Sequence, residues 1–202
     1  MPLSSGGSHG GKFARSMALP EGYLTVLERL GRVFDAYHQH TGDRAVLVGG
    51  AATVIYTAGT FLSADFDIVA SASDAFDAAL IAEGFRREER TGHLMVGFYH
   101  TDHPEYGFQQ VSGQLFDGRS DRKRLVILPT TGGGAITLPS IEDLIADRLG
   151  QHAIASKTDD SRLQQAVWLF RLADQIDRDY LLKRVMEEGG DPDLLPLGAA
   201  GS

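Results

Sequence analysis

The chain has 202 residues, of which 43% are hydrophobic and 23% are charged, and it contains no cysteine. This composition is typical of a globular protein, and the lack of cysteine excludes a disulfide scaffold, a zinc ribbon, a thiol nucleophile and an iron–sulfur centre. The formal net charge of −8 argues against a broadly basic coat that binds nucleic acid. No apolar run approaches the roughly 18 residues needed to span a bilayer, so we expect a cytoplasmic protein with no membrane partner.

Changes in composition divide the chain into four parts. Residues 1–19 are rich in Gly and Ser and are predicted to form a disordered tail. An α/β domain is expected over residues 20–138, and a C-terminal helical lobe over residues 139–188. Residues 189–202 are again rich in Gly and Pro, and a flexible tail is predicted there.

Hydrophobic periodicity predicts the elements in chain order. A helix is expected from Pro20 to Thr41, because apolar residues recur there at alternating steps of four and three. Ser140, followed by Asp143, resembles a capping box at the start of the helical lobe. The other expected elements are strand 45–48, helix 51–58, strand 65–70, a helix capped by Ser73 and ending near Glu83, paired strands 85–90 and 93–99 around Thr91–Gly92, strands 108–111, 125–128 and 135–138, and helices 141–155, 160–175 and 179–188.

Two adjacent glycines separate the first predicted strand from the helix that follows it. At Gly49 and Gly50 the backbone can approach a ligand closely, because neither residue has a side chain. The start of a helix also offers unpaired N–H groups to an anion such as a phosphate. A Gly-Gly pair after a strand is commonly just a turn, and this stretch alone favours that interpretation.

Asp65 and Asp67 stand two residues apart on a predicted strand. Side chains alternate between the faces of a strand, so both carboxylates are expected on one face, roughly 7 Å apart. A divalent cation such as Mg²⁺ can sit between two such carboxylates together with substrate phosphates. The glycine turn and the carboxylate pair together therefore indicate nucleotide–metal chemistry. The alternative is that the pair lies on a solvated sheet face.

In order and spacing these motifs resemble the DNA-polymerase-β-like nucleotidyltransferase superfamily, and within it the small bacterial branch that includes AbiEii-type toxin nucleotidyltransferases. That family carries a Gly-Gly or Gly-Ser turn after its first strand, then a helix and an Asp-x-Asp strand. Ser63 matches the small hydroxyl residue often found just before the acidic pair. Residues 140–149 are similar to the start of the family's later helix, and Asp159–Asp160 stand where a further Asp typically begins the next one. The resemblance covers about residues 46–170.

This resemblance implies a fold and a reaction. The implied fold is an α/β (α+β) nucleotidyltransferase-type mixed sheet with flanking helices and a C-terminal helical lobe. The implied reaction moves an NMP from an NTP to an acceptor hydroxyl with Mg²⁺ or Mn²⁺. The implied acceptors are RNA, especially the tRNA 3′ end, a protein side chain, or a small molecule such as an aminoglycoside.

The same resemblance implies roles for particular residues. Gly49, Gly50 and Ser63 would hold the nucleotide, and Asp65 and Asp67 would ligate the metal and act in catalysis. Arg148 would contact the phosphates, and Asp160 or Asp159 would orient Arg148 or the acceptor.

One departure from the family concerns a third acidic residue, which catalytic members place on a neighbouring strand. The corresponding stretch here offers Gln109 and Gln110. An amide binds Mg²⁺ more weakly than a carboxylate and cannot act as a general base. Glu105 and Asp117 are the acids that could substitute, and neither is well placed. The alternative function is therefore a catalytically degenerate binding or regulatory module of a toxin–antitoxin or defence pair, with a cognate protein partner.

Helical geometry gives an independent reason to single out Arg148. It shares a helix face with Ile141, Ile145 and His152, so it is expected to point toward the packed side. A buried guanidinium needs an anionic partner. That partner is either a phosphate or an aspartate of the sheet, and the sequence leaves both open.

Other polar and aromatic groups carry weaker signals. A basic loop is expected at Arg119, Arg122, Lys123 and Arg124; it is either solvated or able to hold an RNA backbone. Trp168 is expected to pack within the helical lobe rather than to stack on a base.

Overall fold

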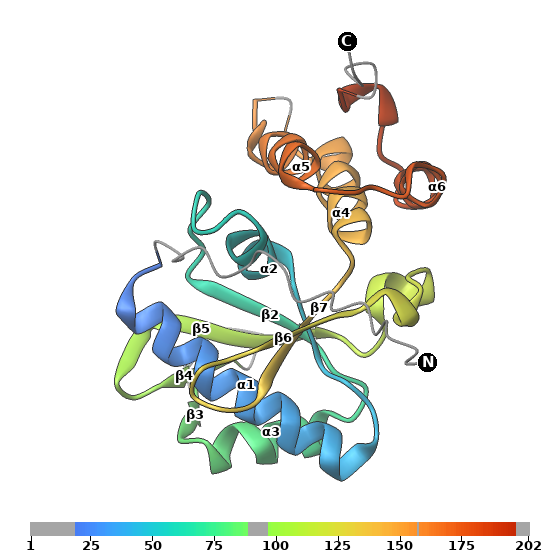
Figure 1. The fold of residues 1–202 in the computed structure, drawn as a ribbon. Helices are drawn as coiled ribbons and strands as arrows, with labels where there is room; N and C mark the ends of the chain where they lie inside the picture. The colour runs from blue at the N-terminus through green and yellow to red at the C-terminus, as the bar shows by residue number, and fades with distance from the viewer. Residues whose placement is uncertain (1–18, 89–96, 157, 197–202) are drawn as a thin grey trace, which may run out of the picture.

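A five-stranded mixed sheet lies at the centre of this computed structural model, which describes residues 19–88, 97–156 and 158–196 (Figure 1). Across the sheet the strands are β1 (Val46–Val48), β2 (Asp65–Val69), β5 (His103–Ser112), β4 (Phe98–His100) and β3 (Phe85–Arg87). Only the β2–β5 pair is parallel; the other neighbours are antiparallel. A separate antiparallel pair is formed by β6 (Val126–Pro129) and β7 (Ala135–Leu138).

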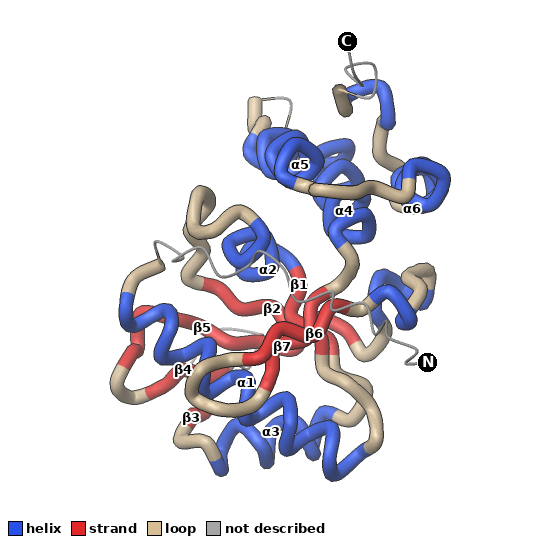
Figure 2. Tube along the Cα trace, viewed as in Figure 1, coloured by secondary structure: helices blue, strands red, loops and turns tan. Residues whose placement is uncertain are grey.

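Helices flank the sheet and continue into a lobe beyond it (Figure 2). Helices α1 (Glu21–Thr41) and α3 (Ser73–Ala82) cover one face, and α2 (Gly49–Tyr56) lies on the other. The C-terminal lobe consists of α4 (Ile141–Ile154), α5 (Ser161–Leu172) and α6 (Arg178–Glu187). The predicted α/β class, with a mixed sheet, flanking helices and a C-terminal helical lobe, is confirmed. Within the described residues, no helix is both long enough and apolar enough to cross a bilayer.

Several element boundaries differ from the sequence-based expectation. Helix α2 begins at Gly49 itself, without a leading turn. Ser73 is the first residue of α3 and makes no capping hydrogen bond, so the predicted cap is wrong. Residues 189–196, predicted as part of a flexible tail, include the short 3₁₀ helix η3 (Pro192–Leu194), and Leu195 is buried. The turn expected at Thr91–Gly92 lies outside the described residues.

Alternation along β2 separates the core from the functional side of the sheet. Phe66 and Ile68 are fully buried and face α1, where the ring of Tyr23 lies 4.9 Å from that of Phe66. Asp65 and Asp67 occupy the intervening positions and face the opposite way, as the pattern predicted. We call this second side, which is not covered by α1 and α3, the site face.

A buried ion pair lies within the helical lobe and also bonds to the segment between β5 and β6. Asp143, in the first turn of α4, accepts a hydrogen bond from Arg184 Nε of α6 at 2.7 Å, and both side chains are fully buried. The same carboxylate accepts hydrogen bonds from the hydroxyls of Tyr180, Ser120 and Ser140. Burial alone would lower the pKa of Arg184, but its hydrogen bonds to acidic side chains outweigh this and raise that pKa.

Replacing Arg184 with Met is expected to destabilise the protein by about 3–5 kcal/mol, because it leaves the Asp143 carboxylate buried without its cation. The matched control is Lys183→Met on the same helix. Lys183 is 65% exposed and pairs with Glu187 at 3.7 Å, so its loss should cost less than about 1 kcal/mol. Urea denaturation followed by circular dichroism measures both values, and equal destabilisation by the two variants would contradict the structural role assigned to the buried pair.

Candidate active site

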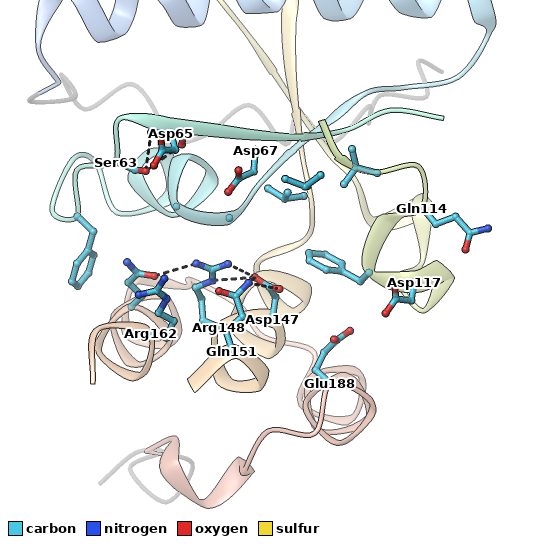
Figure 3. A pocket seen from close by; sticks show the side chains of 18 of the residues that line it. Ser63, Asp65, Asp67, Gln114, Asp117, Asp147, Arg148, Gln151, Arg162 and Glu188 are labelled. Carbon is cyan, nitrogen blue, oxygen red and sulfur yellow. Dashed lines mark hydrogen bonds and ion pairs between the residues drawn. The ribbon is translucent and has the colours of Figure 1, made fainter. Parts of the chain in front are cut away.

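A cavity of about 540 Å³ lies between the site face of the sheet and the helical lobe (Figure 3). One wall is formed by β2, the start of α2 and the loop that follows α2. The opposite wall is formed by α4 and α5. Among the residues predicted for the site, Gly49, Gly50, Ser63, Asp65, Asp67 and Arg148 all line this cavity, whereas Asp160 does not.

Both glycines at the start of α2 are required by close contacts. Gly49 has φ of +66°, and a Cβ added there would stand 2.7 Å from Asp67 Oδ2. A Cβ added at Gly50 would stand 2.8 Å from Ser63 Oγ. The glycine turn and the Asp-x-Asp strand therefore meet in space, and the absence of side chains at Gly49 and Gly50 is what permits the approach. The start of α2 therefore lies beside Asp67 and Ser63.

Gln109 stands beside Asp67 because of the parallel register of β2 and β5. Asp67 is paired with Gln109 across the two strands, and Gln109 Nε2 donates a hydrogen bond of 2.7 Å to Asp67 Oδ1. Gln110 is paired with Ile68, which is a core position, so it belongs to the other side of the sheet. Of the two glutamines singled out in the sequence, Gln109 is the one on the site face.

Arg148 faces the aspartates from the helical wall. It is only 4% exposed, which agrees with its predicted position on the packed side of α4. Its Nε donates to Asp147 Oδ2 at 3.0 Å, its Nη2 contacts the same oxygen, and its Nη1 reaches Gln165 Oε1 at 3.4 Å. The anionic partner of Arg148 is thus its neighbour on the same helix and not an aspartate of the sheet.

The Asp159–Asp160 pair does not reach Arg148 through any hydrogen bond within the described part of the chain. Asp160 precedes α5 and its side chain makes no capping hydrogen bond. Asp159 accepts a hydrogen bond from the Ser161 backbone at 3.0 Å and pairs with Arg162 Nη1 at 3.4 Å. Hydrogen bonds from Ser161 lower the pKa of Asp159. Arg162 lines the cavity, so Asp159 is placed to orient Arg162.

The sequence did not lead us to predict three residues that line the cavity, namely Arg162, Asp147 and Gln165. Arg162 and Gln165 are three residues apart on α5 and both line the cavity. This spacing puts them on one helix face, a signal that the sequence contains. Asp147 could have been noticed as the acidic neighbour of a buried arginine.

The predicted basic loop is held by acidic side chains of the protein itself. Each of its arginines has a partner at 2.6 Å, which restricts its freedom to meet a phosphate backbone. Arg124 also lies over the ring of Tyr180, with Cζ 4.0 Å from the centroid. The pairs are Arg119 with Asp117, Arg122 with Asp43, and Arg124 with Asp177.

The oxygen donors of the site fit a metal that is shared with a substrate. The described residues contain no group of three or more His, Cys, Asp or Glu side chains able to hold a metal ion. Asp65 and Asp67 offer hard carboxylate oxygens, but Asp67 Oδ1 already accepts the Gln109 amide. Mg²⁺ commonly takes one or two carboxylates and completes its shell with water and substrate phosphates. The pair therefore suits Mg²⁺ or Mn²⁺ that arrives with a nucleotide.

Replacing Gly49 with Ala tests the close approach, and Gly42→Ala is the matched control. Gly42 also has positive φ, at +75°, but a Cβ there would meet nothing within 4 Å. The control should cost about 1–2 kcal/mol from backbone strain alone. Gly49→Ala should cost about 1–3 kcal/mol more, because the added methyl must displace Asp67. Thermal or urea unfolding of both variants measures this difference, and equal losses would show that the contact with Asp67 is unimportant.

Comparison with known proteins identifies the fold. No family model matches the chain, and no curated protein sequence matches it. An antigenic nucleotidyltransferase-like protein from Paracoccidioides brasiliensis superposes with a TM-score of 0.57 and 15% identity, covering 82% of this chain and 86% of that one. The antibiotic-resistance factor ANT(2'')-Ia superposes with a TM-score of 0.51 and 11% identity, covering 81% and 90%. The chain therefore has the mixed α/β fold of nucleotidyltransferase-like proteins.

Proposed function

We propose that this protein transfers an NMP from an NTP to an acceptor hydroxyl. The observation that carries the proposal is the meeting of the glycine turn with Asp65 and Asp67 in one cavity, opposite the buried Arg148. The N–H groups at the start of α2, which the two glycines leave accessible, suit the triphosphate. The carboxylates of Asp65 and Asp67 suit a divalent metal, and the guanidinium of Arg148 suits phosphate oxygens. The nucleotidyltransferase-like fold supports the same reaction class.

In the proposed reaction the acceptor oxygen forms a bond to the α-phosphorus, and the bond from that phosphorus to the bridging oxygen breaks. Pyrophosphate leaves with the electron pair. The start of α2 and Ser63 hold the phosphates in line, and Arg148 offsets the charge that develops on them. A bound Mg²⁺ or Mn²⁺ would supply further charge neutralisation. The Gln109 amide on β5 cannot act as a base, so the proton of the acceptor hydroxyl leaves to solvent and not to this side chain.

The nature of the acceptor belongs to this proposal as well. The arginines of the basic loop are engaged in ion pairs, which favours a small hydroxyl compound or a protein side chain over a long RNA. A tRNA 3′ end, the AbiEii-type branch and a role as a toxin rest on the sequence motifs alone and stay predictions.

Changing Asp65 and Asp67 together to Asn is expected to lower transfer at least about a hundredfold, because the metal loses its carboxylates and the reacting phosphate loses charge compensation. The assay uses each α-labelled NTP with Mg²⁺ or Mn²⁺, total cellular RNA and a panel of small hydroxyl compounds. Label is followed on RNA, protein and small molecules. Asp74→Asn is the control, since Asp74 is an exposed aspartate on α3. Undiminished labelling by the double variant would refute the proposed function.

A second candidate function is favoured by the hydrogen bond between Gln109 and Asp67. The Gln109 amide gives the Asp67 carboxylate a hydrogen-bond donor from the protein itself, so the site is stable without a metal. This arrangement suits a binding or regulatory module that has lost turnover. Such a module would bind nucleotide and transfer nothing.

Gln109→Glu distinguishes the two candidates, since it places a carboxylate beside Asp67 as a third acid. An enzyme that works with two carboxylates should gain about tenfold or more in transfer rate from an added base, whereas a decayed module should change from no transfer to measurable transfer. Gln110→Glu makes the same chemical change on the other side of the sheet and should give no gain. A gain from Gln110→Glu alone would refute the placement of Gln109 as the third-acid position.

A further inference from the structure

The cavity extends past the two aspartates toward two chemically different ends (Figure 3). The site-face residues of β2 run from Asp65 through Asp67 to Val69, and the cavity follows them. We call the two directions the Asp65 end and the Val69 end. The Asp65 end is lined by Phe61, Leu62, Arg162 and Gln165, and the Val69 end by Val111, Phe116, Asp117 and Glu188.

The charged groups of the two ends differ in how firmly the protein pairs them. The Asp65 end presents the guanidinium of Arg162, which is 42% exposed and makes a long ion pair of 3.4 Å with Asp159. The Val69 end presents the carboxylates of Asp117 and Glu188, which are paired with Arg119 and Arg184. An anionic nucleotide anchored at Gly49 therefore meets a weakly paired cation at the Asp65 end and carboxylates already paired within the protein at the Val69 end.

An aromatic surface outside the core stands at the Asp65 end. Phe61 lines the cavity and meets Trp168 edge to face, with ring centroids 6.4 Å apart and planes at 78°. Trp168 is 43% exposed rather than packed in the lobe as predicted, and neither ring belongs to the two hydrophobic clusters of the described residues. Phe116 at the other end differs, because it packs against one of those clusters and lies near the Arg184 guanidinium.

A hydrogen-bonding amide lies at the same end as Phe61. Gln165 accepts from Arg148 through its carbonyl oxygen Oε1, and among the described residues no hydrogen bond uses its Nε2. A nucleobase needs an apolar face to stack on and polar groups at its edge. Phe61 and Gln165 offer both, on the same side of the phosphate site as Arg162.

We propose that the Asp65 end is the nucleobase subsite, in which the base of the NTP stacks on Phe61 and accepts a hydrogen bond from Gln165. This assignment rests on the proposed function and adds to it the direction in which the nucleotide lies. The Val69 end is then the side from which the acceptor hydroxyl approaches the α-phosphate.

The only tryptophan of the chain, Trp168, reports directly on this subsite. The protein is titrated in Mg²⁺ with each NTP and, separately, with inorganic tripolyphosphate, which carries the charge but no base. NTPs are expected to change the emission of Trp168, whereas tripolyphosphate should bind with little change. Calorimetry gives the affinity of each ligand independently of fluorescence.

Variants then locate the base. Phe61→Ala should weaken NTP binding about tenfold or more, as expected for a lost stacking contact, and leave tripolyphosphate affinity unchanged. Phe61→Tyr keeps the ring and should bind NTP like the wild type. Leu172→Ala is the control, an exposed apolar residue of α5 that does not line the cavity.

The possible failures are distinguishable. If Phe61→Ala weakens NTP and tripolyphosphate equally, or weakens neither, the nucleobase subsite is wrong while the proposed function stands. If wild-type protein binds neither ligand, or if changing Asp65 and Asp67 to Asn leaves binding of both and transfer unaltered, the proposed function fails and the subsite fails with it.

Discussion

The buried pair of Asp143 and Arg184 fixes where the second wall of the cavity stands. Both side chains are fully buried, and an unpaired charge in that position would be strongly destabilising. Asp143 lies in the first turn of α4, and Arg148 follows it on the same helix. Ser120, from the segment between β5 and β6, bonds to the same carboxylate. One polar centre therefore orients α4, α6 and this segment together, and with them the guanidinium that faces the two aspartates.

The first wall depends on the absence of two side chains. Gly49 and Gly50 bring the start of α2 against Asp67 and Ser63, at separations that a Cβ would turn into clashes. The antiparallel pairing of β1 with β2 sets this contact, because Val48 is opposite Asp67. The core residues of β2 and β5, such as Phe66 stacked on Phe108 at 4.6 Å, hold the other face. Rigid apolar packing on one side thus positions a polar, partly exposed site on the other.

The parts of the site set by local pattern could be predicted from the sequence, and the parts set by packing between elements could not. Alternation placed Asp65 and Asp67 on one face, and helical spacing placed Arg148 on the packed side of α4. The partner of Arg148 depends on its side-chain rotamer, and in the observed rotamer the guanidinium pairs with Asp147. The spacing of Arg162 and Gln165 indicates a shared helix face, but whether that face meets the cavity depends on the angle between α4 and α5, which no local pattern contains. Gln109 and Gln110 were indistinguishable until the register of β2 against β5 was known.

That register also sets the electrostatic balance of the site. With glutamine at position 109, the site face carries two carboxylates beside the glycine turn, and one oxygen of Asp67 is already engaged by an amide donor. Across the cavity, Arg148 is paired with Asp147, while Arg162 makes a long ion pair with Asp159 and a hydrogen bond to Ser161. Two carboxylates match the charge of a single divalent cation. Under the proposed function, this balance suits one Mg²⁺ or Mn²⁺ held by Asp65 and Asp67, with the weakly paired Arg162 facing the phosphates.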